Sequence, residues 1–141
     1  MAPRGTLEVT LVGGKNLKNM DKVGNMDPYC IINYKDQEKR SNTAESQGSD
    51  PDWNETFLFT IAGSIDELRI KIMDEDDIGS DDDVGECTIP LDSLLDTGDE
   101  ARIDAQPYDV MRRGEVYGEL TVGLFFNPEV IFFSCAAVLT D

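Results

Sequence analysis

A stretch of ten residues, DEDDIGSDDD at positions 74–83, contains the side chains best suited to bind a ligand. Seven of these ten side chains are carboxylates. Two carboxylates about 4 Å apart repel each other by roughly 4 kcal/mol at an effective dielectric constant near 20. A loop with this charge therefore needs either a bound cation or side chains that spread into water.

Carboxylates in two separate parts of the sequence repeat at the same spacing. Asp21 and Asp27 are six residues apart, and Asp74 and Asp76 are followed by Asp82 six residues further along. If both segments form loops at the same end of a β-sandwich, these five carboxylates surround one small volume. Ca²⁺ prefers such a site because it binds roughly 6–8 oxygen ligands in flexible geometry, whereas Mg²⁺ requires a stricter octahedron. We therefore predict a calcium site; a solvated acidic surface is the alternative interpretation.

The remaining aspartates of the acidic stretch are weaker candidates for ligands. We expect Asp77, Asp81 and Asp83 to adjust the local electrostatic field rather than to bind the ion. Asp81 or Asp83 would replace Asp82 as a ligand if the loop is shifted by one residue.

Composition excludes several classes of function. The formal net charge of −17 argues against general nucleic-acid binding, which depends on Lys and Arg to neutralise phosphates. The absence of histidine removes Ser-His-Asp and Cys-His catalysis. Cys30, Cys87 and Cys135 are odd in number and far apart, and no apolar signal segment opens the chain. We therefore expect reduced thiols and a cytoplasmic location.

A period of two recurs along the chain and predicts β-strands. It is clear in residues 7–12, 57–61, 68–73 and 120–126, with a more continuously apolar strand at 29–34. Weaker strands are expected at 39–45, 85–90 and 103–109, and one helical turn at 91–95. About eight short strands with almost no helical pattern predict an all-β fold, an eight-stranded antiparallel β-sandwich.

The apolar segment VIFFSCAAVL at 130–139 does not fit this pattern. Its ten residues are about half of the roughly 20 that a membrane-spanning helix needs. We expect a single domain at 1–128 and a short tail of unknown role at 129–141. A last strand, a disordered end and a membrane-inserting end are the alternatives for this tail.

Four segments in sequence order resemble a C2 domain. They are DPY at 27–29, SDPDWNETFLF at 49–59, ELRIKIMDED at 67–76 and DDDVG at 81–85, and the likeness extends over about residues 5–128. The resemblance implies that Asp21, Asp27, Asp74, Asp76 and Asp82 bind Ca²⁺, helped by the backbone carbonyls of Met20 and Glu75. GELTVGLFF at 118–126 is similar to the strand that opens the other C2 topology, which implies the type II arrangement. A short acidic form of this kind resembles the small plant C2 proteins of the elicitor-responsive type.

The resemblance also implies a function, which is calcium-dependent docking onto anionic phospholipid membranes. A cytoplasmic protein would then move to the plasma membrane when calcium rises, in calcium or defence signalling. The apolar residues expected at the loop tips are Val23, Met26 and Ile78. The basic residues expected to meet lipid are Lys35, Lys39, Arg40, Arg69 and Lys71.

Two rival functions compete with lipid docking. The first is an adaptor that uses the same fold to bind a protein partner. The second is an aspartic protease, because Asp96-Thr97-Gly98 matches the DTG triplet and a homodimer would pair two such carboxylates. Turn formation around Gly98 explains the triplet more simply, so we expect no enzymatic activity. The sequence leaves the oligomeric state open.

Overall fold

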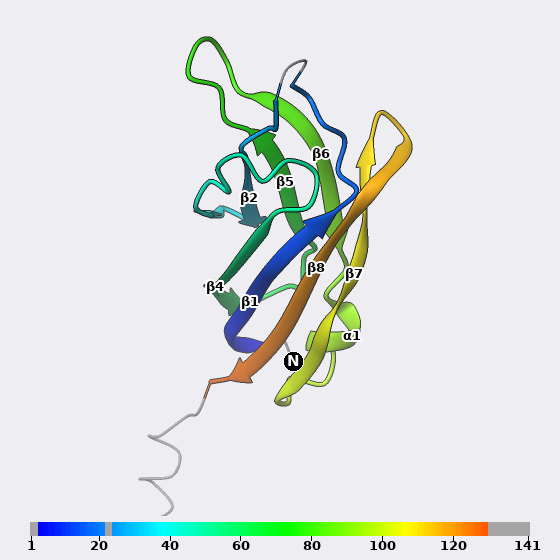
Figure 1. The fold of residues 1–141 in the computed structure, drawn as a ribbon. Helices are drawn as coiled ribbons and strands as arrows, with labels where there is room; N and C mark the ends of the chain where they lie inside the picture. Colours follow the sequence, from blue (N-terminus) through cyan, green and yellow to red (C-terminus); the bar gives the residue numbers. More distant parts are fainter. Residues whose placement is uncertain (1–2, 22–23, 130–141) are drawn as a thin grey trace, which may run out of the picture.

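A computed structural model describes residues 3–21 and 24–129 of the chain (Figure 1). Within these residues the chain forms eight strands and one short helix. In chain order they are β1 (Arg4–Lys15), β2 (Pro28–Tyr34), β3 (Gln37–Arg40), β4 (Asp52–Ala62), β5 (Leu68–Asp74), β6 (Asp82–Ile89), α1 (Asp92–Leu95), β7 (Ala101–Arg112) and β8 (Glu115–Pro128).

The strands follow one another in the hydrogen-bonded order β3-β2-β5-β6-β7-β8-β1-β4, and the paired neighbours are antiparallel. Between β6 and β7 the register contains only Glu86 opposite Met111. The order therefore divides there into two four-stranded layers that face each other (Figure 1). This confirms the predicted antiparallel sandwich, and β8 lies between β1 and β7 as the type II arrangement requires.

The core lies between the two layers and explains the alternating sequence pattern. Leu7, Val9 and Leu11 of β1 are fully buried, as are Leu68, Ile70 and Ile72 of β5. In β8 the same is true of every second residue from Leu120 to Phe126. Successive side chains of a strand point to opposite faces, so burial of one face imposes a period of two.

The two acidic segments lie at the same end of the sandwich. The loop that leads into β2 and the loop between β5 and β6 lie together at the top of Figure 1, near the turn between β7 and β8. Pro28, the first residue of β2, is opposite Asp74, the last residue of β5. Antiparallel pairing of these strands therefore brings the two loops side by side.

One weaker expectation differs in detail from the structure, and another is not tested by it. β3 ends at Arg40, because Ser41 leaves the ladder and its Oγ accepts a hydrogen bond from the Cys30 N–H at 2.8 Å. The apolar segment 130–139 lies outside the described residues. Within the described residues, no helix is both long enough and apolar enough to cross a membrane.

Candidate metal centre

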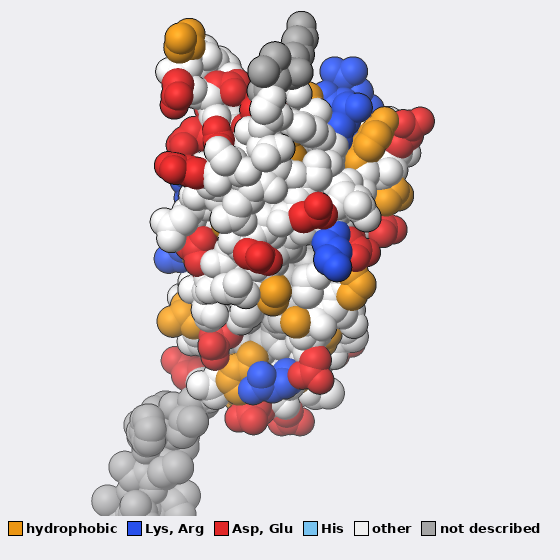
Figure 2. All heavy atoms as spheres, viewed as in Figure 1, with side chains coloured by type: hydrophobic (Ala, Val, Ile, Leu, Met, Phe, Trp, Pro, Cys, Tyr) orange, Lys and Arg blue, Asp and Glu red, His pale blue; other side chains and the backbone are white. Residues whose placement is uncertain are grey.

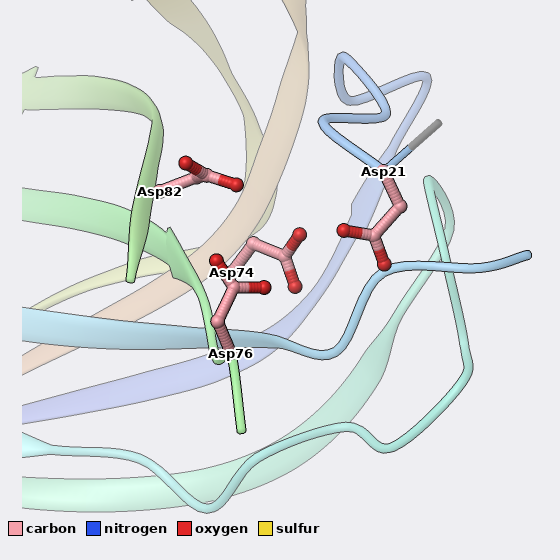
Figure 3. Close-up of side chains that lie close together, drawn as sticks. All are labelled: Asp21, Asp74, Asp76 and Asp82. Carbon is pink, nitrogen blue, oxygen red and sulfur yellow. The ribbon is translucent and has the colours of Figure 1, made fainter. Parts of the chain in front are cut away.

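Four carboxylates from two loops meet at this end of the sandwich. Asp21, Asp74, Asp76 and Asp82 each offer an oxygen atom, and these four atoms lie within 4.8 Å of one another. Figure 3 shows Asp74, Asp76 and Asp82 together on the β5–β6 side, with Asp21 facing them from the other loop. The structure thus brings together four of the five aspartates predicted from the sequence.

Strand pairing positions two of these four side chains, and a third follows directly after the strand end. Asp74 ends β5 and Asp82 begins β6, and the two residues are opposite each other in the register. Asp76 lies two residues beyond Asp74, where the chain has left the strand. The antiparallel β5–β6 pair therefore brings Asp74 and Asp82 together, and Asp76 lies close to them because β5 ends only two residues before it.

Asp74 has the environment that most clearly favours a bound cation. Its side chain is fully buried, and its Oδ1 accepts a hydrogen bond from the Asp27 N–H at 2.9 Å. Its Oδ2 is buried and has no hydrogen-bond partner among the described residues. Burial, followed by the neighbouring acids Asp21 and Asp76, raises the pKa of Asp74 from 3.8 to about 7.

A buried carboxylate oxygen without a partner is costly, and oxygen ligands in number suit Ca²⁺. The pKa of Asp76 is also raised, by burial first and then by Asp82 and Asp21. Both raised pKa values indicate carboxylates that are held close together, partly or fully away from water, without a neighbouring positive charge. The residues present therefore fit a hard divalent cation.

Asp27 lies next to this group but is not a member of it. Its Oδ1 accepts a hydrogen bond from the Ser46 N–H at 2.6 Å, which ties the loop 41–51 to the start of β2. Its backbone N–H and carbonyl bond to Asp74 and to the Glu75 N–H. Asp27 positions the start of the β5–β6 loop, and its ligand role stays a prediction. The same holds for the backbone carbonyls of Met20 and Glu75.

Asp81 accepts two hydrogen bonds that the sequence did not reveal and that hold the β5–β6 loop in shape; we call these contacts the Asp81 brace. The Tyr29 hydroxyl donates to Asp81 Oδ2 at 2.5 Å, and Asp81 Oδ1 accepts from the Asp76 N–H at 3.0 Å. The Tyr29 bond, with that N–H, lowers the pKa of Asp81. Burial and this same contact raise the pKa of Tyr29 to about 12. Asp81 thus stabilises the loop from outside the four-carboxylate group. The sequence showed an aspartate at this position but gave no sign of its hydrogen bond to Tyr29.

The three apolar residues expected at the loop tips have different environments. Ile78 is 93% exposed at the tip of the β5–β6 loop. Met26 is fully buried in the core, so the expectation that it meets the membrane is wrong. The loop 41–51 folds over it, with the Gly48 N–H donating to the Met26 carbonyl at 3.0 Å. Val23 lies outside the described residues.

The basic residues expected to meet lipid are mostly paired with acids. Arg40 bonds to Glu75 at 3.0 Å, Arg69 to Glu67 at 2.9 Å, and Lys71 approaches Asp83 at 4.0 Å. The Arg40 guanidinium also stacks 3.8 Å from the centre of the Tyr29 ring. Lys35 donates to the Ser64 carbonyl, and Lys39 is exposed on β3. Glu75 and Asp83 are distant in the sequence from Arg40 and Lys71, so these two pairings were hidden, whereas Glu67 lies only two residues from Arg69.

The DTG triplet forms the turn that follows α1. The Asp96 N–H donates to the Asp92 carbonyl at 2.9 Å, and the Gly98 N–H donates to the Leu95 carbonyl at 3.1 Å. Thr97 Oγ1 accepts a hydrogen bond from the Asp99 N–H at 3.2 Å. Asp96 is exposed. These contacts fit the turn interpretation of the triplet.

The chain belongs to the C2 domain family, which matches residues 5–106. It is 47% identical over 126 residues to elicitor-responsive protein 3 of rice (Oryza sativa subsp. japonica), which covers 89% of this chain and 85% of that protein. A solved C2 domain-containing protein from a putative elicitor-responsive gene is 43% identical, with a TM-score of 0.77 over 92% of this chain and 93% of that one. The C2A and C2B domains of extended synaptotagmin 2, solved calcium bound, are 26% identical, with a TM-score of 0.69 over 88% of this chain and 46% of that one.

Proposed function

We propose that this chain is a non-enzymatic C2 module that binds phospholipid membranes when calcium is present. The observation that carries the proposal is the convergence of four aspartates around the buried, unpartnered Oδ2 of Asp74. The calcium-bound extended synaptotagmin 2 domains support the choice of cation.

The carboxylates of the site would act by providing negative charge that binds a cation, and by fixing the positions of the two loops. Asp21, Asp76 and Asp82, which are partly exposed, present negative charge that repels anionic lipid, although salt screens this repulsion beyond about 8 Å. Calcium, when bound, supplies the positive charge that the carboxylates lack and offers open coordination positions to lipid phosphates. Ile78, exposed at the neighbouring loop tip, adds an apolar contact with the headgroup region.

The proposal includes a location and a setting. A cytoplasmic protein with this site would move to the plasma membrane when calcium rises, and would leave it when calcium falls. The names of the rice relative and of the solved structure from a putative elicitor-responsive gene support a role in calcium or defence signalling.

Co-sedimentation with vesicles tests the proposal. Vesicles of phosphatidylcholine alone, and of phosphatidylcholine with phosphatidylserine, are each mixed with the protein in calcium or in a chelator. We expect binding only to the anionic vesicles and only with calcium. Failure to bind in every condition would overturn lipid docking and favour a protein partner for the same fold.

A further inference from the structure

The turn between β7 and β8 carries positive charge and apolar surface in a strongly acidic protein. We call residues 111–117 the β7–β8 tip. It contains Arg112, Arg113 and Glu115, a net charge of +1 in a chain of −17. Neither arginine has an acidic partner within 4.0 Å among the described residues. Met111 is 41% exposed and Val116 is 54% exposed.

The β7–β8 tip lies at the same end of the sandwich as the metal centre (Figure 1). Figure 2 shows Lys and Arg side chains next to hydrophobic ones over this turn, while acidic side chains gather over the β5–β6 loop. A flat surface that approaches this end therefore meets the acidic loop and the β7–β8 tip together.

Close contacts join the β7–β8 tip to the loop that carries Asp21. Gly118 follows the tip with a φ of +82°, and a Cβ there would lie 2.3 Å from the Lys15 carbonyl oxygen. Only glycine allows the backbones to approach so closely. The Lys18 Nζ lies 5.0 Å from the centre of the Tyr117 ring, within cation–π range.

Further contacts join the tip to β6, which begins with Asp82. Gly85 packs so closely that a Cβ there would lie 2.6 Å from Val110 Cγ1. Arg112 Nε points at the Asp83 carbonyl oxygen at 3.4 Å, a long hydrogen bond. The tip is therefore fixed relative to both loops of the metal centre.

We infer that the β7–β8 tip is a further lipid-contacting element, in which Arg112 and Arg113 meet anionic headgroups and Val116 adds apolar contact. This inference rests on the proposed function, because it needs the calcium-loaded loops to bring this end to a membrane. Charge complementarity and continuity with the metal centre select an anionic lipid surface as the partner. The basic residues on β3 and β5 offer less, because acids neutralise most of them.

Charge removal gives the first test. R112Q/R113Q should bind phosphatidylserine-containing vesicles roughly thirtyfold more weakly in calcium, because each basic residue near an anionic surface contributes about fivefold. R4Q/R102Q removes the same charge from strand ends remote from the metal centre and should bind like the wild type. Calcium affinity without lipid should change little in either variant.

Depth of insertion gives the second test. Val116→Trp and Leu58→Trp place a reporter at sites of similar exposure, because Leu58 is 57% exposed on β4. Lipids with brominated acyl chains should quench the first reporter in calcium and leave the second unchanged. If the wild type does not bind vesicles, the proposed function fails. If the wild type binds but R112Q/R113Q binds equally well and Val116→Trp is not quenched, only this inference is overturned.

Discussion

Two acidic segments of this chain look alike in composition and differ in structure. Residues 74–83 contain seven carboxylates, and the turn after α1, residues 96–100, contains three. In the first segment Asp74 and Asp76 turn inward toward Asp82, and Asp74 is fully buried. In the second, Asp96, Asp99 and Glu100 are exposed to water. A metal centre is therefore defined by convergence of carboxylates, not by their number.

Removing two converging carboxylates should abolish the response to calcium. Wild-type protein at a calcium concentration of about 100 times the dissociation constant should gain roughly 2.7 kcal/mol in its free energy of unfolding. Asp76→Asn with Asp82→Asn should gain almost nothing, because two of the four converging oxygen donors are weakened. Its melting temperature without calcium should rise, because repulsion falls. Thermal unfolding with calcium and with chelator measures both effects.

The matched control for this variant comes from the exposed turn. Asp96→Asn with Asp99→Asn removes the same formal charge, and its calcium-induced stabilisation should equal that of the wild type. An equal loss in both double variants would mean that net charge, rather than the four-carboxylate site, governs the response.

Loss of the Asp81 brace should weaken calcium binding less than loss of the converging carboxylates. Tyr29→Phe removes the hydrogen bond to Asp81 and keeps the buried ring, so calcium affinity should fall about tenfold, the lower end of the usual outer-shell effect. Asp81→Asn should behave similarly. Asp83→Asn is the control, because its exposed side chain only approaches Lys71 at 4.0 Å. Titration calorimetry measures the calcium affinity of all three variants. Equal affinities for Asp81→Asn and Asp83→Asn would contradict a role of the Asp81 brace in calcium binding.

Much of the fold was readable from the sequence because burial of one strand face leaves a period of two. The four converging aspartates were readable because strand pairing and loop spacing set their positions. Met26 was misplaced, because nothing in its neighbours shows that loop 41–51 closes over it. The partners of Tyr29 and Arg40 were invisible, since each is a contact between residues far apart in the chain.

The raised pKa of Asp74 predicts a pH dependence with a definite sign. The folded pKa of about 7 exceeds the ordinary 3.8, so the ion-free folded protein holds a proton that the unfolded chain has lost between these values. Stability without calcium should therefore fall as the pH rises from about 4 to about 7. Calcium must displace this proton, so its dissociation constant should increase roughly fivefold from about pH 7 to about pH 6. Calorimetry at both values checks this, and an unchanged constant would mean that Asp74 is already ionised.

The smallest effect is expected on the face of β2 and β5, where positive charges already have acidic partners. Arg69 bonds to Glu67, and Lys71 approaches Asp83, so neither residue adds much net attraction for an anionic membrane. Exposed pairs of this kind contribute at most about 1 kcal/mol. Arg69→Gln with Lys71→Gln should change vesicle binding less than about threefold, against roughly thirtyfold for the same change at the β7–β8 tip. A larger loss on this face would show that membrane binding pulls these side chains from their partners, and would move the lipid contact from the loop end to the side of the sandwich.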